Sequence, residues 1–159
     1  MNKKVEDWIK RNLSDGGRVL DVGSFDVNGN PSHLFGDYRG VDIREGSGVD
    51  IVLDAETELV RMFGKESFDT VLCLSTLEHV KRFWFMLGEI HAVIKKGGLL
   101  FLSVPGISFP EHDHPSDYWR FTKSAVTDAI MEGYKILDIE EVPTKPEKNY
   151  IINCLGKKI

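Results

Sequence analysis

The chain has 159 residues, of which 42% are hydrophobic and 28% charged, and its formal net charge is -5. This is the composition of an ordinary globular protein that is long enough to bury a core. The acidic balance lacks the basic footprint typical of nucleic-acid binders. No apolar run is long enough to cross a bilayer. We therefore expect one domain over residues 1–159 that binds neither nucleic acid nor membrane.

The chain start and the cysteines give the cues to compartment. Lys3 and Lys4 are not followed by the apolar segment of a secretory signal. Cys73 and Cys154 each lie in an apolar run, which favours buried free thiols in a reducing compartment. No cysteine or histidine spacing resembles a zinc site. We expect a cytoplasmic protein; the sequence leaves its oligomeric state open.

Apolar runs alternate with amphipathic stretches, which is typical of an α/β fold on a mainly parallel sheet. Val5, Trp8 and Ile9 recur at helical spacing and predict an N-terminal helix over about 2–14. Five strands are then expected, at 18–22, 38–42, 49–53, 68–74 and 99–104. The fourth of them should be central, because its end is almost wholly apolar.

The connecting helices carry recognisable ends. Asn30 is expected to cap a helix that has Pro31 at its first position, and Thr122 to cap another that runs through Ile130. Two helices between strands are expected to bury apolar side chains, the first Leu59, Met62 and Phe63, the second Phe83, Leu87, Ile90 and Ile94. The second should end in the basic and glycine residues 95–98.

The last two strands are expected at 136–142 and 150–155. The segment between them, 143–148, contains two prolines and has no room for a helix, so the strands should form an antiparallel hairpin. The predicted fold is a Rossmann-like, seven-stranded, mainly parallel sheet flanked by helices. Such sheets bind ligands outside the carboxyl ends of their strands.

The turn after the first strand has features of a nucleotide site. Gly23 has no Cβ, so a ligand can approach the backbone. Asp42 follows about 20 residues later, the spacing of an acid that binds ribose hydroxyls. The dinucleotide fingerprint fails because Phe25 and Asn28 replace its glycines, and no P-loop motif occurs. An adenosine ligand without phosphates remains, beside the plainer alternatives of a ligand-free tight turn and an exposed aspartate.

At these residues the chain resembles class I S-adenosylmethionine-dependent methyltransferases, particularly the type-11 group. Asp21 to Gly23 match the start of the family's first motif, Asp42 its ribose-binding acid, and residues 74–80 its segment after strand four. Gly97 to Leu100 are similar to its entry to strand five. The resemblance implies S-adenosylmethionine as cofactor, bound by Asp21, Gly23, Ser24, Phe25, Asp42, Ile43, Asp54, Ala55, Leu74, Ser75 and His79.

Two of these residues have open roles. Phe25 stands where the family has a glycine, and it could cover the cofactor, lie near the sulfonium as a cation–π partner, or act as a hydrophobic plug. His79 could lie near the cofactor or orient its own helix.

The loop over 105–121 is long for a compact domain, and long loops at the ligand edge are often lids. We expect it to supply the acceptor-facing catalytic residues His112, His114, Tyr118 and Arg120. In the alternative, the loop's aromatic residues only pack it down, and Asp117 pairs with Arg120. The pair His112 and His114 makes a poor metal site, because no placed carboxylate completes it.

The function predicted is methyl transfer to a small-molecule or glycan-type acceptor. A general base is needed only for a poorly ionised acceptor, and His112, His114 and His79 are its candidates in that order. A second hypothesis is a non-catalytic module that binds S-adenosylmethionine. A third, a nicotinamide-dependent oxidoreductase, is disfavoured by the failed glycine fingerprint.

Overall fold

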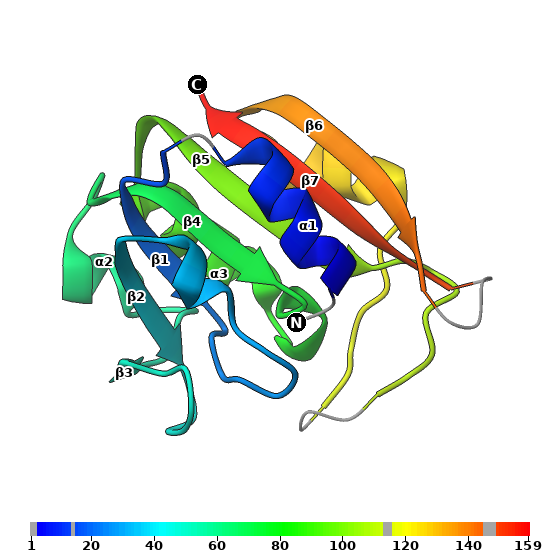
Figure 1. The fold of residues 1–159 in the computed structure, drawn as a ribbon, viewed down its shortest axis with the longest axis horizontal. Coiled ribbons are helices and arrows are strands. Elements are labelled where there is room, and N and C mark those ends of the chain that lie inside the picture. Colours follow the sequence, from blue (N-terminus) through cyan, green and yellow to red (C-terminus); the bar gives the residue numbers. More distant parts are fainter. Residues whose placement is uncertain (1–2, 14, 113–115, 145–148) are drawn as a thin grey trace.

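The computed structural model of the chain describes residues 3–13, 15–112, 116–144 and 149–159. Within them, seven strands form one sheet in the order β3-β2-β1-β4-β5-β7-β6 (Figure 1). The strands are β1 (Arg18–Val22), β2 (Asp37–Asp42), β3 (Ile51–Val52), β4 (Phe68–Leu74), β5 (Ile94–Pro105), β6 (Tyr134–Pro143) and β7 (Tyr150–Lys158). β1 to β5 are parallel, and β7 is antiparallel to both β5 and β6. The predicted fold class and the central place of β4 are confirmed.

Helices cover both faces of the sheet (Figure 1). Helix α1 packs on one face; α2, α3 and the π-helical segment η3 pack on the other. Their bounds, with the two 3₁₀ turns, are α1 (Lys3–Asn12), η1 (Pro31–Leu34), α2 (Leu59–Phe63), η2 (Leu77–His79), α3 (Phe83–Val93) and η3 (Ala125–Ile130). None of the helices in the described parts of the chain is long and apolar enough to span a membrane.

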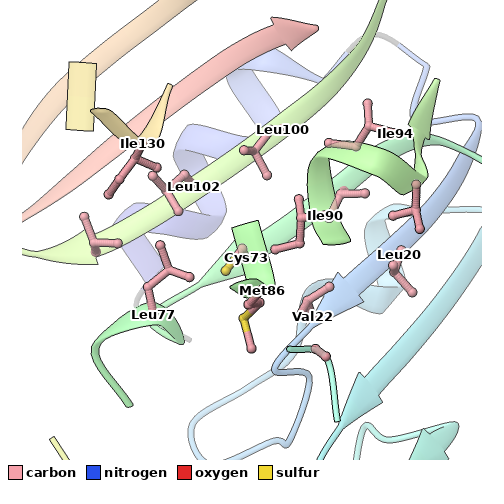
Figure 2. Close-up of a cluster of buried hydrophobic side chains, with 14 of the residues drawn as sticks. Leu20, Val22, Cys73, Leu77, Met86, Ile90, Ile94, Leu100, Leu102 and Ile130 are labelled. Atoms are coloured by element: carbon pink, nitrogen blue, oxygen red, sulfur yellow. The ribbon is translucent and has the colours of Figure 1, made fainter. Parts of the chain in front are cut away.

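Alternation along the strands divides the core into two layers, because successive side chains of a strand point to opposite faces. Leu72 and Phe101 pack with Trp8 of α1. Their neighbours along the strands, among them Cys73 and Leu102, pack with α3 (Figure 2). Both faces of β1 and β4 are therefore buried, which explains their nearly continuous apolar sequences.

Both predicted caps form. The Asn30 side chain accepts a hydrogen bond from the Ser32 N–H at 2.7 Å, with Pro31 at the first position of η1. The Thr122 hydroxyl accepts one from the Ala125 N–H at 3.0 Å. Each cap satisfies a backbone donor that the first turn leaves without a partner. Cys73 and Cys154 are free and buried, as expected.

Two details of the predicted helices are wrong. Helix α3 ends at Val93, and Ile94 instead pairs with Phe68 in the sheet, so that residues 95–98 belong to β5. Met62 is 49% exposed, not inward. Helix α2 is only five residues long, and this single turn brings Leu59 but not Met62 into the core.

Trp8 should anchor α1 to the sheet. Its side chain is fully buried, packs edge-to-face on Phe101 and donates from Nε1 to Asp138 Oδ2 at 2.9 Å. We expect Trp8→Ala to lower the free energy of unfolding by about 3–5 kcal/mol, as is usual for a buried aromatic side chain. Urea unfolding measures this. Trp84→Ala is the matched control, because Trp84 is 51% exposed, and it should cost less than half as much. Equal losses would contradict the anchoring role.

Candidate active site

A cavity of about 860 Å³ opens at the carboxyl ends of the parallel strands. Val22 at the end of β1 lies beside Val41 of β2 and Cys73 of β4, so the segments that follow these strands leave the sheet at one edge. All eleven residues expected at the cofactor line this single cavity: Asp21, Gly23, Ser24, Phe25, Asp42, Ile43, Asp54, Ala55, Leu74, Ser75 and His79. Its volume is within the range of small-molecule sites.

The turn after β1 can be made only by glycine. Gly23 has a φ of +83°, and an ideal Cβ at this position would lie 2.2 Å from the Thr76 hydroxyl oxygen. The N–H groups of Gly23 and Ser24 both donate to the Val41 carbonyl, at 2.9 and 3.0 Å. The hydroxyl of Ser24 is buried in the cavity wall without a hydrogen-bond partner among the described residues. Its oxygen lies against Gly40, 2.7 Å from the position of an ideal Cβ on that glycine.

Asp21 belongs to a buried polar network behind this turn. The Tyr38 hydroxyl donates to Asp21 Oδ2 at 2.6 Å, and Asn30 Nδ2 donates to the Tyr38 oxygen at 2.9 Å. Burial raises the pKa of Asp21 to about 7, against the hydrogen bond from Tyr38, which lowers it. The negative charge of Asp42 raises it further. The carboxyl group therefore changes its charge near neutral pH.

Asp42 ends β2 with its carboxylate held by the backbone. Oδ1 accepts from the Arg44 N–H at 2.9 Å and Oδ2 from the Phe25 N–H at 3.4 Å. The Arg44 guanidinium lies over the Phe25 ring, 4.5 Å from its centroid. Phe25 thus has a cation–π partner within the chain, and it also lines the cavity. Asp54, after β3, accepts from the Glu56 N–H at 2.9 Å.

The end of β4 carries a second buried carboxyl group. Ser75 has a φ of +50°, an uncommon conformation for a residue other than glycine, and it turns the chain into η2. The Glu78 side chain in η2 is 1% exposed, and burial raises its pKa to about 8. Its Oε2 has no hydrogen-bond partner among the described residues.

The long loop after β5 is bonded to η2 and forms the opposite wall of the cavity. The Tyr118 N–H donates to the Glu78 carbonyl at 2.7 Å, and Trp119 Nε1 donates to the Val80 carbonyl at 3.0 Å. His79 Nδ1 lies 2.6 Å from the Ser116 carbonyl oxygen. These bonds place four loop residues in the cavity wall, namely Phe109, Pro110, His112 and Tyr118.

The acceptor-facing residues expected from the sequence are only partly brought together. His112 and Tyr118 line the cavity, whereas Arg120 does not. The Arg120 guanidinium makes two 2.5 Å bonds to Asp117 and further bonds to the carbonyls of Phe109 and Pro110. It holds the loop together, as in the alternative in which Asp117 pairs with Arg120, and contact of Arg120 with the acceptor stays a prediction. His114 lies outside the described residues.

Sequence reasoning missed several parts of the wall. Arg44 and Thr76 follow β2 and β4, where the rule of strand ends could have found them. Val5, Thr144 and Ile151 come from α1 and from the C-terminal hairpin. No local signal marks these three, because only the packing of distant elements brings them to the cavity.

Comparison with known proteins agrees with this architecture. Residues 1–131 match a family described as methyltransferase domain. The chain belongs to this family, and its resemblance to class I S-adenosylmethionine-dependent methyltransferases is confirmed; the type-11 group is not the family whose model matches. The chain is thus an enzyme of the methyltransferase class, with S-adenosylmethionine as cofactor. No curated protein matches the sequence.

Solved structures share the fold at low identity. The 1,6-didemethyltoxoflavin-N1-methyltransferase of Burkholderia thailandensis is 18% identical with a TM-score of 0.78, over 98% of this chain and 77% of that one. The [4+2]-cyclase SpnF is 16% identical with a TM-score of 0.76, over 98% and 80%. A methyltransferase from Methanosarcina mazei is 16% identical with a TM-score of 0.72, over 96% and 97%.

The raised pKa of Asp21 predicts a pH-dependent cost to folding. Because the folded carboxyl group holds its proton up to about pH 7 while the unfolded one releases it near 3.8, the cost is absent in acid and grows as the pH rises between these values. We expect Asp21→Asn, which cannot ionise, to gain stability over the parent between about pH 4 and 7, by at most about 4 kcal/mol. Urea unfolding across this range measures the difference. A constant difference would contradict the prediction.

Proposed function

We propose that the chain transfers a methyl group from S-adenosylmethionine to a small-molecule or glycan-type acceptor bound in the same cavity. The convergence of the eleven expected residues on one cavity wall supports this most directly. The cofactor supplies a methyl group on a positively charged sulfonium. The protein's main task is then to align the acceptor, which is worth about 7–11 kcal/mol of barrier.

The residues after β1 and β2 suit the donor. Gly23 and Ser24 both line the cavity, and Gly23 makes the tight turn that packs against Thr76. The Asp42 side chain is 11% exposed, and a carboxylate there can accept from the ribose hydroxyls. The neighbour from Burkholderia thailandensis holds S-adenosylhomocysteine, which supports the same class of ligand for this fold.

The loop after β5 suits the acceptor. Phe109 and Pro110 give the wall apolar surface, and His112 and Tyr118 add a few polar groups, as small-molecule sites require. His112 is the first candidate for a base towards a hydroxyl acceptor. The Burkholderia enzyme holds 1,6-didemethyltoxoflavin, a small molecule, as its second ligand. The net charge of -5 speaks against a nucleic-acid acceptor.

A different reaction in the same cavity is the second candidate, because a structural neighbour of this fold is described as a cyclase. We also propose the cytoplasm as compartment, since two free buried thiols suit a reducing environment.

The first test is ligand choice. We expect calorimetry to show that S-adenosylhomocysteine and S-adenosylmethionine bind and that NAD does not, because the phosphates of a dinucleotide find no glycine cradle. Transfer of a labelled methyl group to a component of metabolite extracts would then separate an enzyme from a binding module. Micromolar affinity for NAD without a response to S-adenosylhomocysteine would overturn the proposal.

The second test compares the two aspartates at opposite ends of β2. Asp42 lines the cavity, whereas Asp37 is exposed at the other edge of the sheet. We expect Asp42→Ala to weaken binding of S-adenosylhomocysteine about tenfold to a hundredfold, since hydrogen bonds to a charged group contribute about 1.5–3 kcal/mol. Asp37→Ala should bind as the parent does. Unchanged affinity in a folded Asp42→Ala protein would remove Asp42 from the donor site.

A further inference from the structure

Three side chains of metal-ligating type converge where η2 meets the long loop. They are Glu78 and His79 of η2 and His112 of the loop, and one ligand atom of each lies within 4.8 Å of the others. Glu78 Oε1 is 3.9 Å from His79 Nε2 and 4.0 Å from His112 Nε2. The two imidazole rings meet edge-to-face, with their centroids 4.9 Å apart. His79 and His112 also line the cavity, so the cluster lies at its wall.

The two histidines are oriented by acceptors behind them. His79 Nδ1 is 2.6 Å from the Ser116 carbonyl oxygen, and His112 Nδ1 is 3.2 Å from Asp117 Oδ2 and 3.3 Å from the Pro110 carbonyl oxygen. A carbonyl or carboxylate oxygen requires the proton on Nδ1, which leaves the Nε2 lone pair on the Glu78 side. Histidines that bind metals are held in this way, by a carbonyl or carboxylate on the other ring nitrogen.

Glu78 supplies an independent observation. Its side chain is 1% exposed, and Oε2 has no hydrogen-bond partner among the described residues. A carboxyl group is rarely buried without such a partner, because the lost hydration is costly. Arg120 does not provide it, since its guanidinium is bound to Asp117 and to loop carbonyls. The other carboxylate oxygen, Oε1, is the one that faces the imidazole Nε2 atoms, at 3.9 and 4.0 Å, so a cation bound there through Oε1 would compensate the buried carboxylate.

We propose that Glu78, His79 and His112 bind one divalent first-row transition metal ion at the wall of the cavity. Two imidazoles and one carboxylate form the ligand set of open catalytic sites, in which further positions remain for water or substrate. Imidazole nitrogen favours such ions over Mg²⁺ and Ca²⁺, which take oxygen ligands.

The two separations from Glu78 require only a small adjustment. Metal–ligand bonds of about 2.0–2.2 Å place neighbouring ligand atoms about 3–3.4 Å apart, so the Glu78–imidazole separations would shorten by roughly 0.5–1 Å. Because His79 and His112 line the cavity, an oxygen atom of the acceptor could reach an ion held there. That last role rests on the proposed function, whereas binding of the ion does not.

The test uses the full chain after removal of metal by a chelator. We expect calorimetry with Zn²⁺ to give one site per chain, and Co²⁺ to give the visible absorption of a cobalt ion bound to nitrogen. Glu78→Gln and His112→Ala should each weaken Zn²⁺ binding at least tenfold and remove the Co²⁺ spectrum. His33→Ala, which removes an exposed imidazole outside the cavity wall, should bind as the parent does.

Binding of S-adenosylhomocysteine, measured on the same proteins, serves as the check on folding and should change by less than about twofold in Glu78→Gln and His112→Ala. The proposed site would be overturned if Zn²⁺ did not bind stoichiometrically, or if Glu78→Gln and His112→Ala bound Zn²⁺ as tightly as the parent. It would also be overturned if His33→Ala lost as much affinity as these two variants. Binding of Mg²⁺ without Zn²⁺ or Co²⁺ would overturn it as well. Zn²⁺ binding without S-adenosylhomocysteine binding would instead contradict the proposed donor site and leave the metal site standing.

Discussion

The parallel register of β1 with its two neighbours is the constraint on which the cavity depends. Val22 lies beside Val41 and Cys73, so three strands end at one level and their following segments meet. A slip of one residue would exchange the faces of a strand. It would move Asp21 away from Tyr38 and place an apolar neighbour in the cavity wall. The hydrophobic layers on both sides of the sheet thus fix the polar site indirectly.

The wall that the long loop after β5 contributes to the cavity depends on an ion pair and not on the sheet. The Asp117 side chain is 1% exposed, and its hydrogen bonds from Arg120 lower its pKa to about 2. Arg120 also bonds the carbonyls of Phe109 and Pro110, which join the two limbs of the loop. A buried pair of this kind contributes little net stability, because desolvation offsets the attraction. Its effect here is geometric, since it fixes where His112 and Tyr118 meet the cavity.

The sequence predicts what depends on local pattern. β1 and β4 were predicted to the residue, because strands buried on both faces give continuous apolar runs. The caps at Asn30 and Thr122 follow from residue type. The end of α3 was missed because the pairing of Ile94 with Phe68 is a tertiary effect.

The same distinction between local pattern and tertiary contact applies to the residues of the site. The residues expected at the donor follow strand ends, so spacing and resemblance to a family can predict them. Glu78 was within a recognised segment but was not singled out, since nothing in the sequence marks its burial beside two histidines. The role of Arg120 could not be predicted from the sequence either, because an arginine suits both contact with the acceptor and the ion pair with Asp117. Contacts between distant segments decided both.

Acidic side chains outnumber lysines and arginines among the described residues of the cavity wall, where Arg44 and Lys81 are the positively charged ones. Asp21, Asp42 and Asp54 line the side where the donor is expected, and Glu78 is buried next to His79. Burial raises the pKa of both Asp21 and Glu78, which means that each carboxylate lacks a sufficient positive partner in the protein alone. A sulfonium cofactor or a metal ion would supply positive charge there, whereas the phosphates of a dinucleotide would add repulsion. The donor side alone does not decide the reaction, because a cyclase shares this fold. On the proposed function, the groups that distinguish one chemistry from another would lie on the wall built by η2 and the long loop, where His112 and Tyr118 line the cavity.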